Sequence, residues 1–253
     1  MKLVIIGGTG LIGSRLVTLL RKEGHEAVAA SPDTGVNTLT GEGLAPALQS
    51  ASVVVDVSNS PTFEEGAVME FFTTSTRNLL EHAAAAGVRH YVALSVVGTE
   101  RIPDSPYLRA KNAQEMLIKG AGIPYSIVHA TQFFEFINRI ADEATDGTTV
   151  RLPPALIQPM AADDVARAIG EIAVGAPLNG SVDVAGPQPF HFDDLIRQRL
   201  AARNDPREVI ADPHARYFGA ELDERALIPA GPARLGTTRL EDWLKQSGRG
   251  GTA

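Results

Sequence analysis

The chain has 253 residues, of which 44% are hydrophobic and 21% charged, and its formal net charge is −7. These proportions are typical of a globular protein large enough for one domain, or for one domain with a small lobe. The negative charge and the absence of any lysine- or arginine-rich run predict that the protein does not bind nucleic acid. The chain has no cysteine, which excludes disulfides, thiol catalysis and zinc–thiolate sites, and we expect no metal site.

The apolar run at the N-terminus stops at Gly7, which is too early for the core of a signal peptide. No apolar stretch of the sequence approaches the roughly 20 residues that cross a bilayer. We therefore expect a cytoplasmic protein without a membrane partner. The expected oligomeric state is a monomer or a homodimer.

The first thirty residues predict a strand, a turn, a helix and a second strand. Lys2 to Ile6 is apolar and β-branched, as in a strand buried on both faces. The glycine-rich turn Gly7-Gly8-Thr9-Gly10-Leu11-Ile12-Gly13 follows it directly. Ser14 to Glu23 then repeats apolar residues at helical spacing, and Ala27 to Ala30 is typical of the next strand.

A turn of this kind suits a phosphate group. Glycines let the backbone adopt a positive φ and let a phosphate approach without meeting a Cβ atom. The free amides and the positive dipole end of the following helix favour a pyrophosphate. We therefore predict a dinucleotide here, in preference to a purely structural turn. The predicted contacts are Gly7, Thr9, Gly10, Leu11, Ile12 and Gly13.

The residues after the second strand bear on the choice between NAD and NADP. An acidic residue about 20 positions past the glycines favours NAD by binding the ribose 2′-hydroxyl, whereas a basic residue favours NADP. Asp33 has this spacing but follows Pro32, so Ser31 is the expected ribose contact, able to bind a 2′-phosphate without repelling it. Arg15 could add positive charge, and the segment could equally be only a turn. We predict NADP, with NAD possible.

The alternation of strands and helices continues after this point. Ala51 to Val57 is a buried strand that ends in Ser58 and Asn59, and we expect Val57, Ser58 and Asn59 to contact the cofactor because ligands bind at the carboxyl ends of such strands. Glu64 to Gly87 has a helical pattern, and His90 to Ser95 is typical of another strand. The pattern predicts an α/β fold with a doubly wound parallel sheet, the Rossmann fold.

A second motif follows the strand that ends in Ser95. Tyr107 and Lys111 are four residues apart, so they share one face of a helix that begins near Ser105. The lysine is expected to lower the pKa of the phenol, which would then pass a proton to or from a substrate oxygen held by Ser95. The alternative is a surface tyrosine beside a solvated lysine.

These motifs together resemble the short-chain dehydrogenase/reductase superfamily, in its atypical, NmrA-like branch. The resemblance covers about residues 1 to 200, and its most specific part is the glycine-rich turn. It implies that Ser95 positions the carbonyl or alcohol, that Tyr107 is the acid/base, and that Lys111 also binds the nicotinamide ribose. The further matching segments are Asp56 to Asn59, Leu94 to Gly98 and Ile123 to Val128.

The function that follows is an NAD(P)-dependent oxidoreductase transferring hydride between the cofactor and a small-molecule carbonyl or alcohol. The alternative is a non-catalytic sensor of the NADP redox state, because the NmrA-like branch includes such proteins, although they commonly lack the tyrosine. An epimerase or dehydratase that uses the cofactor transiently is a third possibility. The sequence contains no clear signal of a sugar-nucleotide pocket.

The regular alternation weakens in the last part of the chain. We predict a cofactor-binding domain over residues 1–150, and a mixed region over 151–253 that completes the sheet and forms a small C-terminal substrate-binding lobe. His129 is expected to be structural rather than catalytic. Asp163 or Asp164 is expected to cap a helix. The glycine-rich end, Gly248 to Gly251, is expected to fray.

Overall fold

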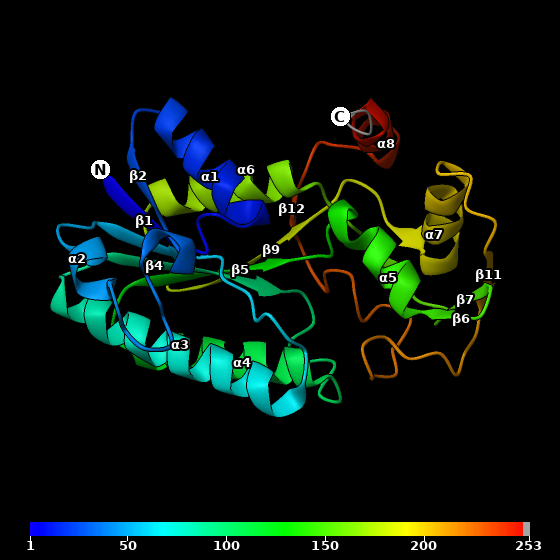
Figure 1. Ribbon diagram of the computed structural model, residues 1–253, viewed down its shortest axis with the longest axis horizontal. Coiled ribbons are helices and arrows are strands. Elements are labelled where there is room, and N and C mark those ends of the chain that lie inside the picture. The colour runs from blue at the N-terminus through cyan, green and yellow to red at the C-terminus, as the bar shows by residue number, and fades with distance from the viewer. Residues whose placement is uncertain (250–253) are drawn as a thin grey trace.

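Seven parallel strands form the central sheet, in the order β12-β9-β5-β4-β3-β1-β2 (Figure 1). The computed structural model describes residues 1–249, so the end of the second predicted domain lies outside the described residues. The predicted doubly wound parallel sheet is confirmed. Its strands are β1 (Lys2–Ile6), β2 (Glu26–Ala30), β3 (Val53–Asp56), β4 (His90–Val96), β5 (Tyr125–Ala130), β9 (Gly180–Ala185) and β12 (Arg234–Leu235).

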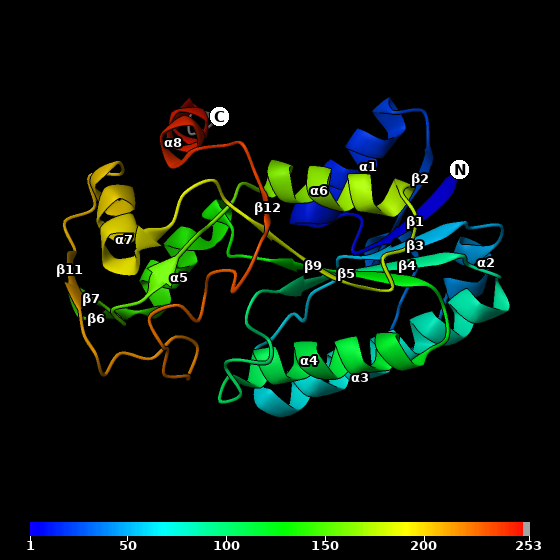
Figure 2. The same cartoon turned by 180° about the vertical axis from the view of Figure 1, so that it is seen from behind.

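Helices cover both faces of this sheet, as the two opposite views show (Figures 1 and 2). Successive residues of a strand point to opposite faces, so Leu3 and Ile5 of β1 pack under one helical layer while Val4 and Ile6 pack under the other. The first layer consists of α1 (Leu11–Lys22) and α6 (Ala162–Val174), and the second of α2 (Leu44–Leu48), α3 (Glu65–Ala85) and α4 (Pro106–Gly120).

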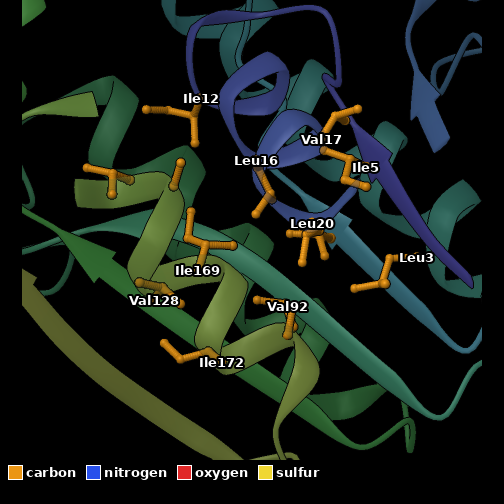
Figure 3. Close-up of a cluster of buried hydrophobic side chains, with 14 of the residues drawn as sticks. Leu3, Ile5, Ile12, Leu16, Val17, Leu20, Val92, Val128, Ile169 and Ile172 are labelled. Atoms are coloured by element: carbon orange, nitrogen blue, oxygen red, sulfur yellow. The ribbon is translucent and has the colours of Figure 1, made fainter. Parts of the chain in front are cut away.

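The apolar contacts between α1, α6 and the sheet form a continuous buried cluster (Figure 3). Leu16 and Leu20 of α1 meet Ile169 and Ile172 of α6 above Val92 of β4, and all of these side chains are buried. Such dense apolar burial contributes most of the free energy of folding. It also fixes the start of α1 against the sheet, where the glycine-rich turn lies.

A lobe projects beyond the carboxyl ends of the sheet strands (Figure 1). Its three-stranded sheet joins β7 in parallel to β11 and antiparallel to β6, and a separate antiparallel pair joins β8 to β10. The elements are α5 (Ile137–Glu143), β6 (Thr145–Asp146), β7 (Thr149–Leu152), β8 (Leu156–Ile157), β10 (Phe190–His191), α7 (Phe192–Ala201) and β11 (Glu208–Ala211). The predicted boundary after residue 150 falls within β7, and the division into two domains stays a prediction.

The last helix, α8 (Leu240–Arg249), follows β12 and packs against the lobe. Helix α8 includes Gly248 and Arg249, whereas the rest of the segment that we expected to fray lies outside the described residues. Within residues 1–249, no helix combines the length and apolar character needed to cross a bilayer.

The predicted cap of α6 is wrong. Ala161 is the N-cap residue and provides no side-chain cap, and the carboxylate of Glu135 accepts the amide hydrogen of Ala162 at 3.2 Å. Asp164 lies in the first turn with its carboxylate turned to the segment before α8, where it accepts the amide hydrogens of Thr237 at 3.0 Å and Thr238 at 2.8 Å. The aspartate therefore anchors a distant segment, which the local sequence could not indicate.

Candidate functional site

A cavity of about 710 Å³ opens between the carboxyl ends of the sheet strands and the lobe. Every residue that the sequence predicted for the site lines it, except Gly13. The structure therefore brings the turn, the strand ends and the start of α4 together. The predicted residues that line the cavity are Gly7, Thr9, Gly10, Leu11, Ile12, Ser31, Val57, Ser58, Asn59, Ser95, Tyr107 and Lys111.

The glycine-rich turn packs too closely for larger residues. Gly7 has φ +76°, and a Cβ atom on Gly13 would lie 2.2 Å from the carbonyl oxygen of Gly7. Gly13 therefore packs against the backbone of the turn and does not line the cavity. Gly10 is the N-cap of α1 and provides no side chain, so the first amide groups of α1 lack a side-chain partner.

These residues fit a dinucleotide. Unpartnered amides at the start of α1 suit the pyrophosphate, and the close glycine packing leaves room for it. At the end of β2, Ser31 lines the cavity, and its buried hydroxyl has no hydrogen-bond partner. A buried polar atom without a partner is costly, and a ribose hydroxyl is a group that could satisfy it.

Tyr107 begins α4, which Ser105 caps by accepting the amide hydrogen of Leu108 at 3.4 Å. The phenol oxygen of Tyr107 donates to Oδ1 of Asn59 at 3.1 Å. Its ring meets Phe72 edge-on, with 5.8 Å between ring centroids. Burial raises the pKa of Tyr107, so the lowering that we expected from Lys111 is wrong. The phenol keeps its proton at neutral pH.

Lys111 lies one helical turn further along α4, with a side chain only 2% exposed. Its ammonium group donates to the carbonyl oxygen of Leu94 at 2.8 Å and to Gln114, and lies 4.4 Å from the ring centroid of Phe72. Burial lowers the pKa of Lys111 to about 8, although the negative charges of Asp56 and Glu115 oppose this effect. The ring of Phe72 thus contacts both Lys111 and Tyr107.

Ser95 donates its hydroxyl proton to Oε1 of Glu115 at 2.6 Å. The same oxygen lies 3.0 Å from Nε2 of His129, whose Nδ1 lies 3.2 Å from Asp183. Burial opposes ionisation of Glu115, but hydrogen bonds from His129 and Ser95 and the charge of Lys119 outweigh it and lower its pKa to about 2. Burial lowers the pKa of His129, and the hydrogen bonds and negative charges of Glu115 and Asp183 more than reverse that effect.

A second buried carboxylate completes this polar network. Asp56, at the end of β3, accepts hydrogen bonds from Gln114 at 2.9 Å and from Tyr91 at 3.2 Å. Gln114 in turn accepts from Lys111, so it links the lysine to Asp56. Sequence reasoning missed Gln114 and Glu115, although Glu115 continues the four-residue spacing of Tyr107 and Lys111 along α4.

Aromatic rings form the outer wall of the cavity. Phe63 stacks on Phe218 of the C-terminal segment with 5.8 Å between centroids, and the guanidinium of Arg139 lies 4.6 Å from the centroid of Phe63. Phe218 has φ +46°, an unfavourable conformation for an aromatic residue, held by hydrogen bonds between the backbones of Tyr217 and Ala220. The turn held by these hydrogen bonds places the ring of Phe218 against Phe63.

Comparison with known proteins identifies the family of the chain and its cofactor. A protein family described as NAD(P)H-binding matches residues 7–173. The chain belongs to this NAD(P)H-binding family, and it has a Rossmann-type cofactor domain. The match confirms the predicted NAD(P) cofactor and is consistent with the NmrA-like branch of the short-chain dehydrogenase/reductase superfamily.

Two curated relatives are photosystem II assembly factors named Ycf39. The one from Cyanophora paradoxa is 25% identical over 224 residues, covering 81% of this chain and 70% of its own. The one from Synechocystis sp. is 22% identical over 227 residues, covering 81% of this chain and 69% of its own.

Solved structures with the same fold include MoeE5 in complex with UDP-glucose and NAD, with a TM-score of 0.75, 18% identity and coverage of 100% of both chains. Another is DesIV, a dTDP-glucose 4,6-dehydratase from Streptomyces venezuelae with NAD and TYD bound, with a TM-score of 0.74, 16% identity and coverage of 99% and 98% of the two chains. At these identities the likeness concerns the fold.

In the described part of the chain, no group of three or more metal-ligating side chains could hold a metal ion.

Proposed function

We propose that the protein is an NAD(P)-dependent oxidoreductase acting on a small carbonyl or alcohol, with Tyr107 as its acid/base. The observation that carries this proposal is that Ser95, Tyr107 and Lys111 line the same cavity as the glycine-rich turn. When bound, the nicotinamide supplies the hydride, and the protein supplies position and polarity.

Each residue has a distinct part in the proposal. Tyr107 gives a proton from its phenol oxygen to the substrate oxygen, because its raised pKa keeps it protonated at neutral pH. Asn59 orients that phenol. Lys111, one helical turn further along α4, binds the nicotinamide ribose. Ser95 accepts a hydrogen bond from the hydroxyl group of the alcohol form of the substrate, since its own proton is donated to Glu115.

The cavity favours a substrate with an apolar body. Its outer wall is made of Phe63, Phe218 and neighbouring apolar residues, and in the described chain Lys111 and Arg139 are its only cationic lining residues. Structural neighbours bind nucleotide sugars, whose diphosphate calls for more positive charge than this cavity offers. An epimerase or dehydratase acting on a nucleotide sugar is therefore less well supported than an oxidoreductase.

The test is oxidation of NADH and NADPH, followed by absorbance, with a panel of aldehydes, ketones and quinones and with UDP-glucose. We expect turnover with at least one small carbonyl compound. The Tyr107→Phe variant should bind the cofactor normally and lose about 100-fold or more in kcat, because general acid catalysis has that size. Tyr125→Phe, at the opposite end of β5, is the matched control. Full turnover by Tyr107→Phe would disprove the assignment.

The second candidate is a non-catalytic regulator that binds NAD(P)H. The similarity to the Ycf39 assembly factors favours it. Because these relatives are photosystem II assembly factors, the cytoplasmic location that we predicted stays a proposal. Saturable cofactor binding, together with no cofactor oxidation by the wild-type protein across the whole panel, would favour this regulator over the enzyme.

A further inference from the structure

The part of the cavity near Ser31 lies where the glycine-rich turn meets the end of β2. The Ser31 side chain is 5% exposed and its hydroxyl has no partner. Asp33, two residues later, accepts a hydrogen bond from the hydroxyl of Thr9 at 3.5 Å, so its carboxylate lies against the turn. The chain therefore offers one free hydroxyl and one negative charge at the place where the adenosine ribose is expected to bind.

Positive charge is missing from the same region. The sequence has no lysine or arginine between Lys22 and Arg77, so β2, α2 and β3 and the loops that connect them contribute none. The two cationic lining residues in the described chain, Lys111 and Arg139, belong to α4 and the lobe. Neither is part of the wall formed by Ser31, Pro32 and Val36.

Arg15, which we considered as a source of charge, is held elsewhere. Its Nε lies 2.9 Å from Oδ1 of Asp163 at the start of α6, and another guanidinium nitrogen donates to the carbonyl oxygen of Leu11 at 2.8 Å. These contacts tie the guanidinium to α6, and it does not line the cavity.

We infer that the site prefers NAD(H) to NADP(H), with Ser31 binding the ribose hydroxyl and Asp33 rejecting a 2′-phosphate. A 2′-phosphate adds nearly two negative charges, which would lie near the Asp33 carboxylate with no cation to offset them. A neutral ribose meets no such repulsion and satisfies the buried hydroxyl. This inference replaces the NADP preference that Ser31 alone suggested, and it deepens the proposed function by resting on its cofactor site.

The test measures binding, so it needs no substrate. Calorimetry of the purified full chain with NADH and with NADPH should give a Kd at least tenfold lower for NADH. Asp33→Asn removes the charge and keeps the size. It should reduce the ratio of the NADPH Kd to the NADH Kd at least threefold, mainly by lowering the Kd for NADPH. Asp146→Asn, an equal change of charge on exposed β6 in the lobe, is the control and should leave the ratio unchanged. Raising the salt concentration should weaken the discrimination, because Asp33 is exposed.

A second variant tests the hydroxyl. Ser31→Ala should weaken NADH binding several-fold, since the hydroxyl is buried in the lining of the cavity and is expected to bind the ribose. Tighter binding of NADPH than of NADH by the wild type, or equal ratios for Asp33→Asn and Asp146→Asn, would overturn the inference. Binding of neither cofactor by the folded protein would refute the proposed function too. Selective NADH binding without turnover would refute only the proposed catalysis.

Discussion

Glu115 is a charged side chain that the structure buries almost completely, with 1% of it exposed. A buried carboxylate persists only when hydrogen bonds and opposite charges offset the loss of water. Ser95, Thr99, His129 and Lys119 provide these contacts, at 2.6 to 3.3 Å. The residue thereby fixes the direction of the Ser95 hydroxyl and joins α4 to β4 and β5.

This arrangement predicts how stability depends on acid. The folded pKa of Glu115 lies at about 2, below the ordinary value of 4.5. An unfolded chain therefore takes up the proton first as the pH falls, and about 3 kcal/mol of stability present above about pH 4.5 is lost towards pH 2. Urea unfolding at pH 5 and pH 3 should show that the free energy of unfolding falls less for Glu115→Gln than for the wild type.

The control for this measurement is Glu241→Gln, which changes an exposed carboxylate at the start of α8. It should keep the wild-type dependence on pH. If Glu115→Gln loses as much stability between the two pH values as the wild type does, Glu115 does not hold the ionised state that the hydrogen bonds indicate.

The glycine-rich turn and α1 act together as one element. Close packing of Gly13 against Gly7 sets the entry of α1 over the sheet, and the buried face of α1 holds that position. Gly10 differs, because it is exposed and a Cβ atom there would meet only the carbonyl oxygen of Gly7, at 3.2 Å. The two glycines therefore serve different purposes, one for folding and one for access of the ligand.

Substitutions at these positions should separate the two effects. Gly13→Ala should lower the melting temperature by several degrees, because its methyl group would overlap the backbone of Gly7 and Gly8. Gly10→Trp should leave the melting temperature close to the wild type and abolish cofactor binding by filling the turn. Calorimetry and thermal unfolding on both variants check this pair. Loss of stability in Gly10→Trp comparable to that in Gly13→Ala would contradict it.

At the scale of the whole molecule, the lobe and the sheet are joined by more than the covalent chain. Within the lobe, Trp243 of α8 stacks on Phe134 with 5.4 Å between ring centroids. Its indole nitrogen donates at 3.2 Å to Glu135, which also accepts the amide hydrogen of Ala162 at the start of α6, the helix that covers the sheet. Arg199 of α7 lies 5.0 Å from the centre of the same indole. Strands β9 and β12 of the central sheet also come from the later part of the chain.

These connections predict a single unfolding transition. Trp243 is the only tryptophan, so its fluorescence reports the docking of α8, while far-UV circular dichroism reports all helices and strands. The two signals should change at the same urea concentration, because the lobe and the sheet share strands and packing. A fluorescence midpoint at clearly lower urea would mean that α8 leaves the lobe before the sheet unfolds.

The sequence predicted the sheet well wherever the information was local. Strands such as Lys2–Ile6 are short apolar runs followed by turn residues, and their order along the chain determines a right-handed, doubly wound sheet. The lobe was predicted in outline only. Its strands are two to four residues long, and β7 pairs with β11 from a distant segment, so no local periodicity identifies them.

The candidate site was predicted to a similar extent. The glycine spacing and the pair Tyr107 and Lys111 are patterns within one short segment, and these residues do line the cavity. The pKa of Tyr107 was misjudged because it depends on burial, which comes from Phe63 and Phe72 on other segments. Glu115 was missed because its partners lie on two different strands, and only the folded chain brings them together.

Helix α6 packs beside α1 over the sheet, although α1 ends at Lys22 and α6 begins only at Ala162. During synthesis, five strands of the sheet are available once Ala130 has emerged, yet Leu16 and Leu20 lack their neighbours on α6 until Val174 follows. The nascent protein thus carries a bare hydrophobic layer while the lobe is still being translated. Apolar surface exposed in this way makes a partly synthesised chain prone to aggregation, and the exposure follows directly from the order of elements along the polypeptide.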